Sequence, residues 1–196
     1  MSYILDPISD NCYPNTTILV NKFDIRDERE LADVEALITF TKTSQLEEHP
    51  LDGCFDFEHY KSIHGFLFED LYDWAGHIRT VNISKKGTRF CPCEEITFQA
   101  RLVFDRLEEK RLFKGLRRKE YIDELVDFYI NTNYLHPFRE GNGRTQRAFI
   151  AQLVRFAGHD IDLSGIDTDL LMMATVQSAN GVNNLLRDIL DYAVRF

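Results

Sequence analysis

Apolar residues recur at intervals of three and four along most of this chain, and that spacing predicts helices. The pattern covers residues 27–46, 56–76, 96–107, 122–130 and 144–158, with further helices expected over 167–178 and 182–195. Apolar and polar residues alternate strictly only at residues 78–83. This piece is followed by Lys85-Lys86-Gly87 and by a second extended piece, 88–90, and the three together predict a β-hairpin. Residues 1–26 contain scattered Asn, Asp and Pro and are expected to form an irregular N-terminal arm on the surface. The sequence therefore predicts one mainly α domain over 27–196, a helical bundle with one β-hairpin.

The composition limits the partners of this domain. Its 196 residues are 44% hydrophobic, which is enough for one core. A net charge of -9 repels a polyanion, so we expect no nucleic-acid partner, and any nucleotide must be bound locally. Four cysteines are too few for a disulfide-stapled secreted scaffold and are expected to be reduced thiols.

Targeting signals give little direction. The N-terminus has neither a basic segment nor a long apolar segment, and no run is long enough to span a bilayer, so we expect no membrane partner. We expect a protein of the bacterial cytoplasm, with export into a host cell as the open alternative. The sequence stops within a helical pattern at Phe196, so we leave open that it is a fragment with a further segment beyond that point.

One segment departs from the helical pattern. It has the sequence His136-Pro137-Phe138-Arg139-Glu140-Gly141-Asn142-Gly143-Arg144-Thr145-Gln146-Arg147. The residue before Pro137 is pushed out of the α region, so the preceding helix must end there. Gly141 and Gly143 leave the backbone bare, and a helix that starts near Arg144 directs free N–H groups into that space. We therefore expect this loop to bind phosphate.

Four side chains of the segment supply the other parts of a nucleotide site. Arg144 and Arg147 lie three residues apart and are expected to share a helix face over the bound anion. Glu140 is a hard carboxylate of the kind that joins Mg²⁺ to a polyphosphate. His136, with an ordinary pKa of about 6.5, is suited to take a proton from an attacking hydroxyl near neutral pH. Each residue alone has a simpler interpretation as a helix end, a solvated cation or a turn, so the argument depends on their combination.

Two other residues of the segment are expected to have no chemical role. Phe138 is interpreted as a core anchor that fixes the loop. Arg139 is expected to be exposed and dispensable.

The segment resembles the Fic family signature, His-x-Phe-x-(Asp/Glu)-Gly-Asn-Gly-Arg-x-x-Arg, and agrees with it at every specified position. The run Leu-Phe-Glu-Asp-Leu-Tyr-Asp-Trp-Ala-Gly at 67–76, followed by Arg79, is similar to the part of Fic proteins that precedes their flap. Most of residues 20–195 can be placed on the Fic pattern. The resemblance implies a Fic-fold helical bundle and a protein adenylyltransferase.

Carried over residue by residue, the resemblance implies that His136 deprotonates a Tyr, Ser or Thr hydroxyl of a target protein, which then attacks the α-phosphorus of ATP. Glu140 would hold Mg²⁺ between the α- and β-phosphates. The anion hole around the α- and β-phosphates would be formed by Gly141, Asn142 and Gly143. The β- and γ-phosphates would be held by Arg144 and Arg147. Pyrophosphate would leave, so catalysis would depend on positioning and charge stabilisation. The adenine pocket is not readable from spacing, and residues around 177–184 are the candidates.

The resemblance also makes the hairpin a flap that aligns an extended target segment by strand addition. The flap residues are Ser84, Lys85, Lys86, Gly87, Thr88, Arg89 and Phe90. Their positive charges favour an acidic target surface, or alternatively protect an exposed strand edge. Similar family members include toxins acting on topoisomerase subunits and exported effectors acting on small GTPases, so a target of either kind is expected.

Fic proteins are commonly restrained by a helix carrying (Ser/Thr)-x-x-x-Glu-(Gly/Asn), whose Glu pairs with the second arginine of the signature. Here only Glu140 is followed by Gly or Asn, and the residue four before it is His136. We therefore expect a separate small helical, antitoxin-like inhibitor that presents a Glu to Arg147.

Other functions remain as alternatives. A Fic-fold phosphotransferase or another nucleotidyl transfer is disfavoured by the unmodified signature. A non-catalytic nucleotide-binding interaction module is disfavoured by the presence of both His136 and Glu140. A P-loop enzyme lacks its Gly-x-x-x-x-Gly-Lys-(Ser/Thr) motif, and a metal-dependent hydrolase lacks enough ligands.

Overall fold

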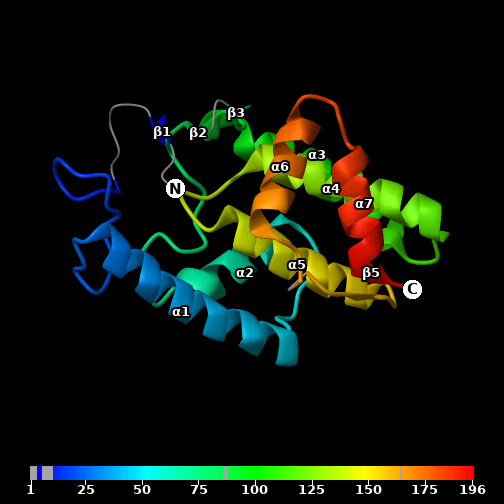
Figure 1. Ribbon diagram of the computed structural model, residues 1–196, viewed down its shortest axis with the longest axis horizontal. Helices are drawn as coiled ribbons and strands as arrows, with labels where there is room; N and C mark the ends of the chain where they lie inside the picture. Colours follow the sequence, from blue (N-terminus) through cyan, green and yellow to red (C-terminus); the bar gives the residue numbers. More distant parts are fainter. Residues whose placement is uncertain (1–3, 6–10, 86–87, 164) are drawn as a thin grey trace.

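The computed structural model describes residues 4–5, 11–85, 88–163 and 165–196, in which seven α-helices form a bundle (Figure 1). The helices are α1 (Glu28–Glu48), α2 (Phe57–Phe68), α3 (Ile96–Glu109), α4 (Arg118–Leu135), α5 (Asn142–Phe156), α6 (Thr168–Ala179) and α7 (Asn184–Ala193). Two short 3₁₀ helices flank α3, η1 (Cys93–Glu95) and η2 (Arg111–Phe113). The mainly helical fold expected from the hydrophobic spacing is confirmed. No helix in the described ranges is long and apolar enough to cross a membrane.

Aspartates begin several of the helices. The side chain of Asp56 accepts a hydrogen bond from the His59 N–H, which confirms the expected N-cap of α2. The expected end of this helix at Gly76 is wrong, because α2 stops at Phe68. The Phe68 carbonyl is taken by the N–H groups of Leu71 and Tyr72, which turn the chain away from the helix axis.

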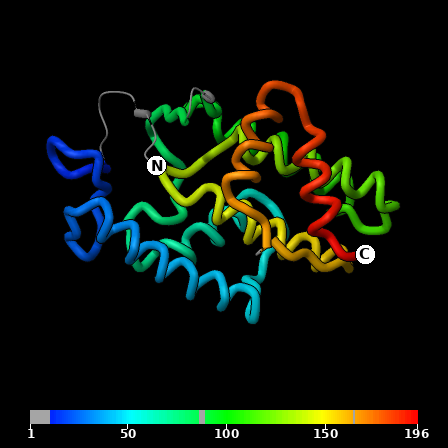
Figure 2. Tube along the Cα trace, in the orientation of Figure 1, coloured from blue at the N-terminus to red at the C-terminus, as the bar shows by residue number. Residues whose placement is uncertain are grey.

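Helix α5 runs through the middle of the molecule, between α1 and α2 on one side and α6 and α7 on the other (Figure 2). It contacts α1, α2 and α4 directly. Phe149, Ile150 and Leu153 on this helix are fully buried. This packing fixes the start of α5 in the centre of the fold, together with the signature loop, residues 136–141, that precedes it.

The flap hairpin is shorter than the sequence pattern suggests. It consists of β2 (Ile83–Lys85) and β3 (Thr88–Arg89), with Ser84 opposite Arg89. Residues 78–82, expected in the first strand, lie outside it, while Lys86 and Gly87 fall outside the described residues. A third strand, β1 (Ile4–Leu5), pairs with β2 from the segment that was expected to be irregular.

A second strand pair lies near the end of the chain. Strand β4 (Asp160–Ile161) pairs with β5 (Val194–Arg195), so the expected last helix stops at Ala193. Pairing with β4 gives the last residues an alternative to helical hydrogen bonds, which helical spacing alone could not indicate.

Residues 11–26 contain no helix and are mostly exposed, but three of their side chains are buried. Tyr13 and Leu19 are buried, and Leu19 joins the main hydrophobic core. The buried Asn21 side chain donates to the carbonyls of Leu19 and Ile25 at 3.0 and 2.8 Å. This amide supplies the hydrogen bonds that an irregular segment needs in order to be buried.

Candidate active site

The signature loop connects α4 to α5 and is fixed by its own side chains. His136 follows α4 in the left-handed region, with φ of 39°. Gly141 also has a positive φ, 77°, and a Cβ there would lie 2.2 Å from the Phe68 ring, so only glycine fits. The Asn142 side chain crosses the loop, donating to the Phe138 carbonyl at 2.8 Å and accepting from the Phe138 N–H at 2.9 Å. Phe138 is fully buried, which confirms its expected role as the anchor.

His136 is neutral and has a defined tautomer. Its Nδ1 lies 3.0 Å from the Asn133 carbonyl oxygen, which can only accept, so Nδ1 carries the proton and Nε2 is the basic nitrogen. The Phe90 ring stacks on the imidazole at 3.7 Å. Burial lowers the pKa of His136 to about 3, and the positive charges of Arg79 and Lys85 act in the same direction. The expected ordinary pKa is therefore wrong, because the imidazole is desolvated.

Arg79 connects the flap region to the signature loop. Its buried guanidinium donates to the carbonyls of His136 at 2.9 Å, Val81 at 2.7 Å and Cys91 at 2.5 Å. Its backbone N–H donates to the Pro137 carbonyl at 2.8 Å. The family resemblance drew attention to this arginine without assigning it a role. The structure shows that it fixes the backbone on which His136 is carried.

His64 supports the loop from the opposite side. It is fully buried on α2, and its Nδ1 accepts from the Gly76 N–H at 2.8 Å. Nε2 therefore carries the proton and donates to the Glu140 carbonyl at 3.1 Å. Burial lowers the pKa of His64 to about 3, so the imidazole is neutral. Sequence reasoning missed this residue, because one histidine among the apolar residues of a helix carries no signal of its own.

The two arginines of the signature point to different places, although they were expected to share a face. The Arg144 guanidinium donates to Glu35 Oε1 at 2.5 Å and to Thr39 Oγ1 at 3.2 Å, both on α1. Arg147 instead lines a cavity beside the loop, and within the described part of the chain no hydrogen bond or ion pair holds its guanidinium. Burial lowers the pKa of Arg147 from its ordinary value. Glu35, which sequence reasoning missed, draws Arg144 away.

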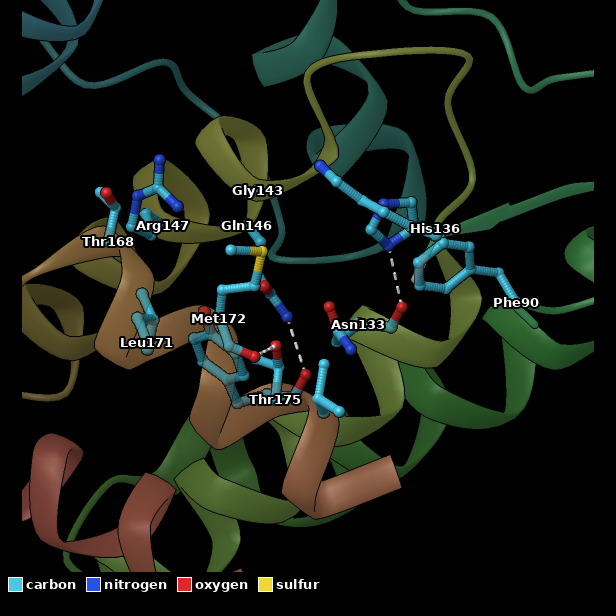
Figure 3. A pocket seen from close by; sticks show the side chains of 13 residues that line it. Phe90, Asn133, His136, Gly143, Gln146, Arg147, Thr168, Leu171, Met172 and Thr175 are labelled. Carbon is cyan, nitrogen blue, oxygen red and sulfur yellow. Dashed lines mark hydrogen bonds between the residues drawn. The ribbon is translucent and has the colours of Figure 1, made fainter. Parts of the chain in front are cut away.

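The cavity beside the loop has a volume of about 170 Å³ and is walled by α4, α5, α6 and the flap (Figure 3). Its lining residues are Lys85, Phe90, Tyr129, Asn133, His136, Gly143, Gln146, Arg147, Thr168, Leu171, Met172, Thr175 and Val176. His136 and Arg147 lie on opposite sides of this cavity, with Met172 between them (Figure 3). Among the residues that the structure describes, no side chain caps the N-terminus of α5, so its first N–H groups remain for an anion.

A second cavity of about 700 Å³ adjoins the first, and the two share Phe90, Tyr129, Asn133, Thr175 and Val176. Among its other lining residues are Ser178, Ala179 and Asn180, which fall in the 177–184 range suggested for the adenine. We therefore regard the two cavities as parts of one site.

Two expectations about charged residues change with the structure. Lys85 lines the first cavity and Arg89 lines the second. These two flap residues, expected to face a target protein or to protect a strand edge, therefore also border the cavities. Arg139, expected to be exposed, is only 5% exposed, and its Nη2 lies 3.5 Å from the Cys12 sulfur. This contact with Cys12 joins residues 127 positions apart, and local sequence does not encode it.

A helical bundle in which a neutral imidazole and an arginine face each other across a cavity, at an uncapped helix N-terminus, defines a site for a phosphate-bearing ligand. The family model described as "Fic/DOC family" matches residues 54–154. This chain belongs to the Fic/DOC family.

Several known proteins are similar to this chain. It is 35% identical to the protein adenylyltransferase VbhT of Bartonella schoenbuchensis, over 92% of this chain and 37% of VbhT. It is also 35% identical to the probable protein adenylyltransferase y4lH of Sinorhizobium fredii, over 90% of this chain and 89% of that protein. Among solved structures, BepC of Bartonella tribocorum, a VirB-translocated effector with bound AMPPNP, has a TM-score of 0.89 at 26% identity and covers 94% of this chain and 96% of its own. The N-terminal Fic domain of a putative cell filamentation protein of Bartonella quintana, with bound ADP, has a TM-score of 0.90 at 27% identity over 94% of each chain.

Proposed function

We propose that this member of the Fic/DOC family, a protein adenylyltransferase, moves AMP from ATP to a Tyr, Ser or Thr hydroxyl of a target protein. The observation that carries the proposal is the placement of neutral His136 and Arg147 across one cavity at the start of α5. The adenylyltransferase relatives and the AMPPNP and ADP bound in similar structures support an adenine nucleotide as the donor.

The phosphates are proposed to lie in the smaller cavity. There the N–H groups of Asn142 and Gly143, in the first turn of α5, offer donors at the positive end of the helix dipole. Arg147 supplies the positive charge, because its guanidinium lines this cavity whereas that of Arg144 is bound to α1. The adenine is proposed to occupy the larger cavity, beside Ser178 and Asn180.

Glu140 is the proposed carboxylate ligand of Mg²⁺. One of its oxygens, Oε1, accepts from the Gly141 N–H at 2.9 Å, while Oε2 makes no hydrogen bond within the described ranges. A lone carboxylate next to a phosphate loop fits Mg²⁺, which takes its other ligands from phosphate oxygens and water. The bound metal would neutralise charge on the phosphates.

The transfer step needs one base. The target hydroxyl oxygen forms a bond to the α-phosphorus, the bond from this phosphorus to the bridging oxygen breaks, and pyrophosphate leaves. The hydroxyl proton passes to Nε2 of His136, while Nδ1–H stays bonded to the Asn133 carbonyl. The negative charge of the bound phosphates opposes the effect of burial on the pKa of His136, and so makes the imidazole a stronger base when ATP is present.

We also propose a target protein that docks by adding a strand to the flap, and a separate helical inhibitor that presents a carboxylate to Arg147. The flap is a short antiparallel pair next to His136, and Phe90 at its end stacks on that imidazole. A carboxylate placed on Arg147 would occupy the guanidinium that the nucleotide needs.

Substitution of the base tests the assignment. His136→Ala is expected to stop transfer and to change ATP affinity, measured by calorimetry, by less than about threefold, because the base acts on the hydroxyl. Arg147→Ala serves as the contrast and should weaken ATP binding itself. Loss of ATP affinity in His136→Ala comparable to that in Arg147→Ala would contradict the proposed role. Undiminished transfer by His136→Ala would point to a different chemistry.

A further inference from the structure

Helix α1 reaches the signature loop through one ion pair. The Glu35 carboxylate lies 2.5 Å from Nη2 of Arg144, and its other oxygen accepts a hydrogen bond from the Tyr72 hydroxyl. The Glu35 side chain is 13% exposed, so solvent screens the pair only weakly. This contact joins residues 109 positions apart in the sequence.

The surroundings fix the geometry of this pair. Thr39 donates its hydroxyl proton to the Glu35 backbone carbonyl at 2.7 Å and accepts from Nη1 of Arg144 at 3.2 Å. The Arg144 guanidinium also lies over the Phe68 ring, 4.8 Å from its centroid. Arg144 is thus oriented by three groups from α1 and α2, all of them outside the nucleotide cavity.

A second carboxylate competes for the same nitrogen. Glu140 Oε1 lies 3.6 Å from Nη2 of Arg144, beyond hydrogen-bond distance, and the two residues are four positions apart. A small movement of the guanidinium would therefore bring this nitrogen into a close pair with Glu140. Within the described part of the chain, Glu35 is the other carboxylate paired with Arg144.

We propose that Glu35 is a positioning residue that holds Arg144 back from Glu140 and so leaves the Glu140 carboxylate for the divalent cation. This inference rests on the proposed role of Glu140 as the metal ligand. Without Glu35, the Arg144 guanidinium would close on Glu140 and compete with the cation for its oxygens. Arg144, on this account, is not a ligand of the phosphates.

Metal binding tests the proposal without relying on turnover. The intact chain would be saturated with AMPPNP, and Mn²⁺ binding would be followed by loss of the free-ion electron paramagnetic resonance signal. Glu35→Gln is expected to raise the Mn²⁺ dissociation constant about fivefold, the effect of strengthening one partly exposed ion pair. Glu30→Gln, at an exposed position on the same helix, removes the same charge and should leave the constant unchanged.

A double variant separates competition from a general loss of structure. In Glu35→Gln/Arg144→Met the competing cation is gone, so the Mn²⁺ dissociation constant should return to within about twofold of that of the unaltered chain. Failure of the second substitution to restore binding would overturn the proposal, as would an unchanged constant in Glu35→Gln. If Glu35→Gln does not fold, Arg144→Met alone decides the matter: unchanged or tighter Mn²⁺ binding is expected, and weaker binding would overturn the proposal.

Glu140→Ala distinguishes failure of this inference from failure of its premise. A large loss of Mn²⁺ binding in Glu140→Ala supports the metal-ligand role. If that loss occurs while Glu35→Gln binds Mn²⁺ normally, the positioning role of Glu35 is overturned and the ligand role stands. If Glu140→Ala binds Mn²⁺ normally, the premise itself fails and the proposal falls with it.

Discussion

Replacing Arg79 with lysine would test whether the flap and the catalytic base are coupled through one guanidinium. Arg79 makes side-chain hydrogen bonds to three carbonyls, those of His136, Val81 and Cys91, and is 3% exposed. An ammonium group keeps the charge, but it cannot reproduce the planar fork that reaches all three. Loss of two such bonds, at about 1.5–3 kcal/mol each for a charged donor, predicts destabilisation of about 3–6 kcal/mol. For a chain of this length the midpoint of thermal unfolding should fall by about 10 °C.

The assay pairs urea unfolding with AMP transfer at a temperature where the variant is folded. Transfer should fall at least about tenfold in Arg79→Lys, because misplacement of the base by a fraction of an ångström weakens proton transfer. Arg101→Lys, on the exposed face of α3, is the matched control and should change neither quantity. If Arg79→Lys unfolds within about 1 kcal/mol of the unaltered chain and transfers AMP at the same rate, the coupling argument is refuted.

Two further predictions concern pH and regulation. Burial lowers the pKa of both His64 and His136 to about 3, so below pH 6.5 the unfolded chain binds more protons than the folded chain. The free energy of unfolding should therefore be at its full value above pH 6.5 and fall on acidification. At pH 5 the expected loss is about 2 kcal/mol for each histidine. Urea unfolding midpoints at pH 7 and pH 5 would check this. The difference between the two midpoints should be smaller in His64→Gln than in the unaltered chain. It should be unchanged in His49→Gln, because His49 is exposed. The purified chain should transfer AMP without any activating treatment, since its sequence has no copy of the inhibitory motif. A variant that lacks the first 50 or the last 30 residues and stays folded should not transfer AMP faster than the full chain. A sharp rise in the rate would reveal an internal inhibitor.

The helices were predictable because hydrophobic spacing is a local property of the sequence. Helices α3, α4 and α5 each place apolar residues on one buried side, and the predicted ranges fall within them except that the last runs two residues past Phe156. Their ends were less predictable. The premature end of α2 depends on hydrogen bonds made by residues 71–76, including one from Gly76 to His64, and spacing carries no record of these.

The signature segment could be recognised because its residue types suit phosphate chemistry and match a family pattern. The structure brings His136, Gly143 and Arg147 together around one cavity, as that pattern implied. The residues that orient them were not predictable. Arg79, His64 and Glu35 reach the loop from segments 57 to 109 positions away, and a single sequence does not show such contacts.

The pKa of His136 shows the same limit. The ordinary pKa expected for His136 followed from its residue type alone, whereas the lowered pKa follows from its burial under Phe90 and the nearby cations. The contact between Cys12 and Arg139 also could not be read from the polar composition of residues 11–26. In both cases the missing information is tertiary environment.

Transfer of label from ATP tests the central claim most directly. The purified chain would be incubated with Mg²⁺ and ATP labelled at either the α- or the γ-phosphate, in the presence of bacterial lysate and of host-cell lysate, since similar proteins include VirB-translocated effectors. His136→Ala provides the blank. The account predicts that protein in at least one lysate acquires label from α-labelled ATP alone, and only with the unaltered chain. Label acquired from the γ-position in excess of the His136→Ala blank would contradict it, because the reaction of this chain would then be transfer of phosphate and not of AMP.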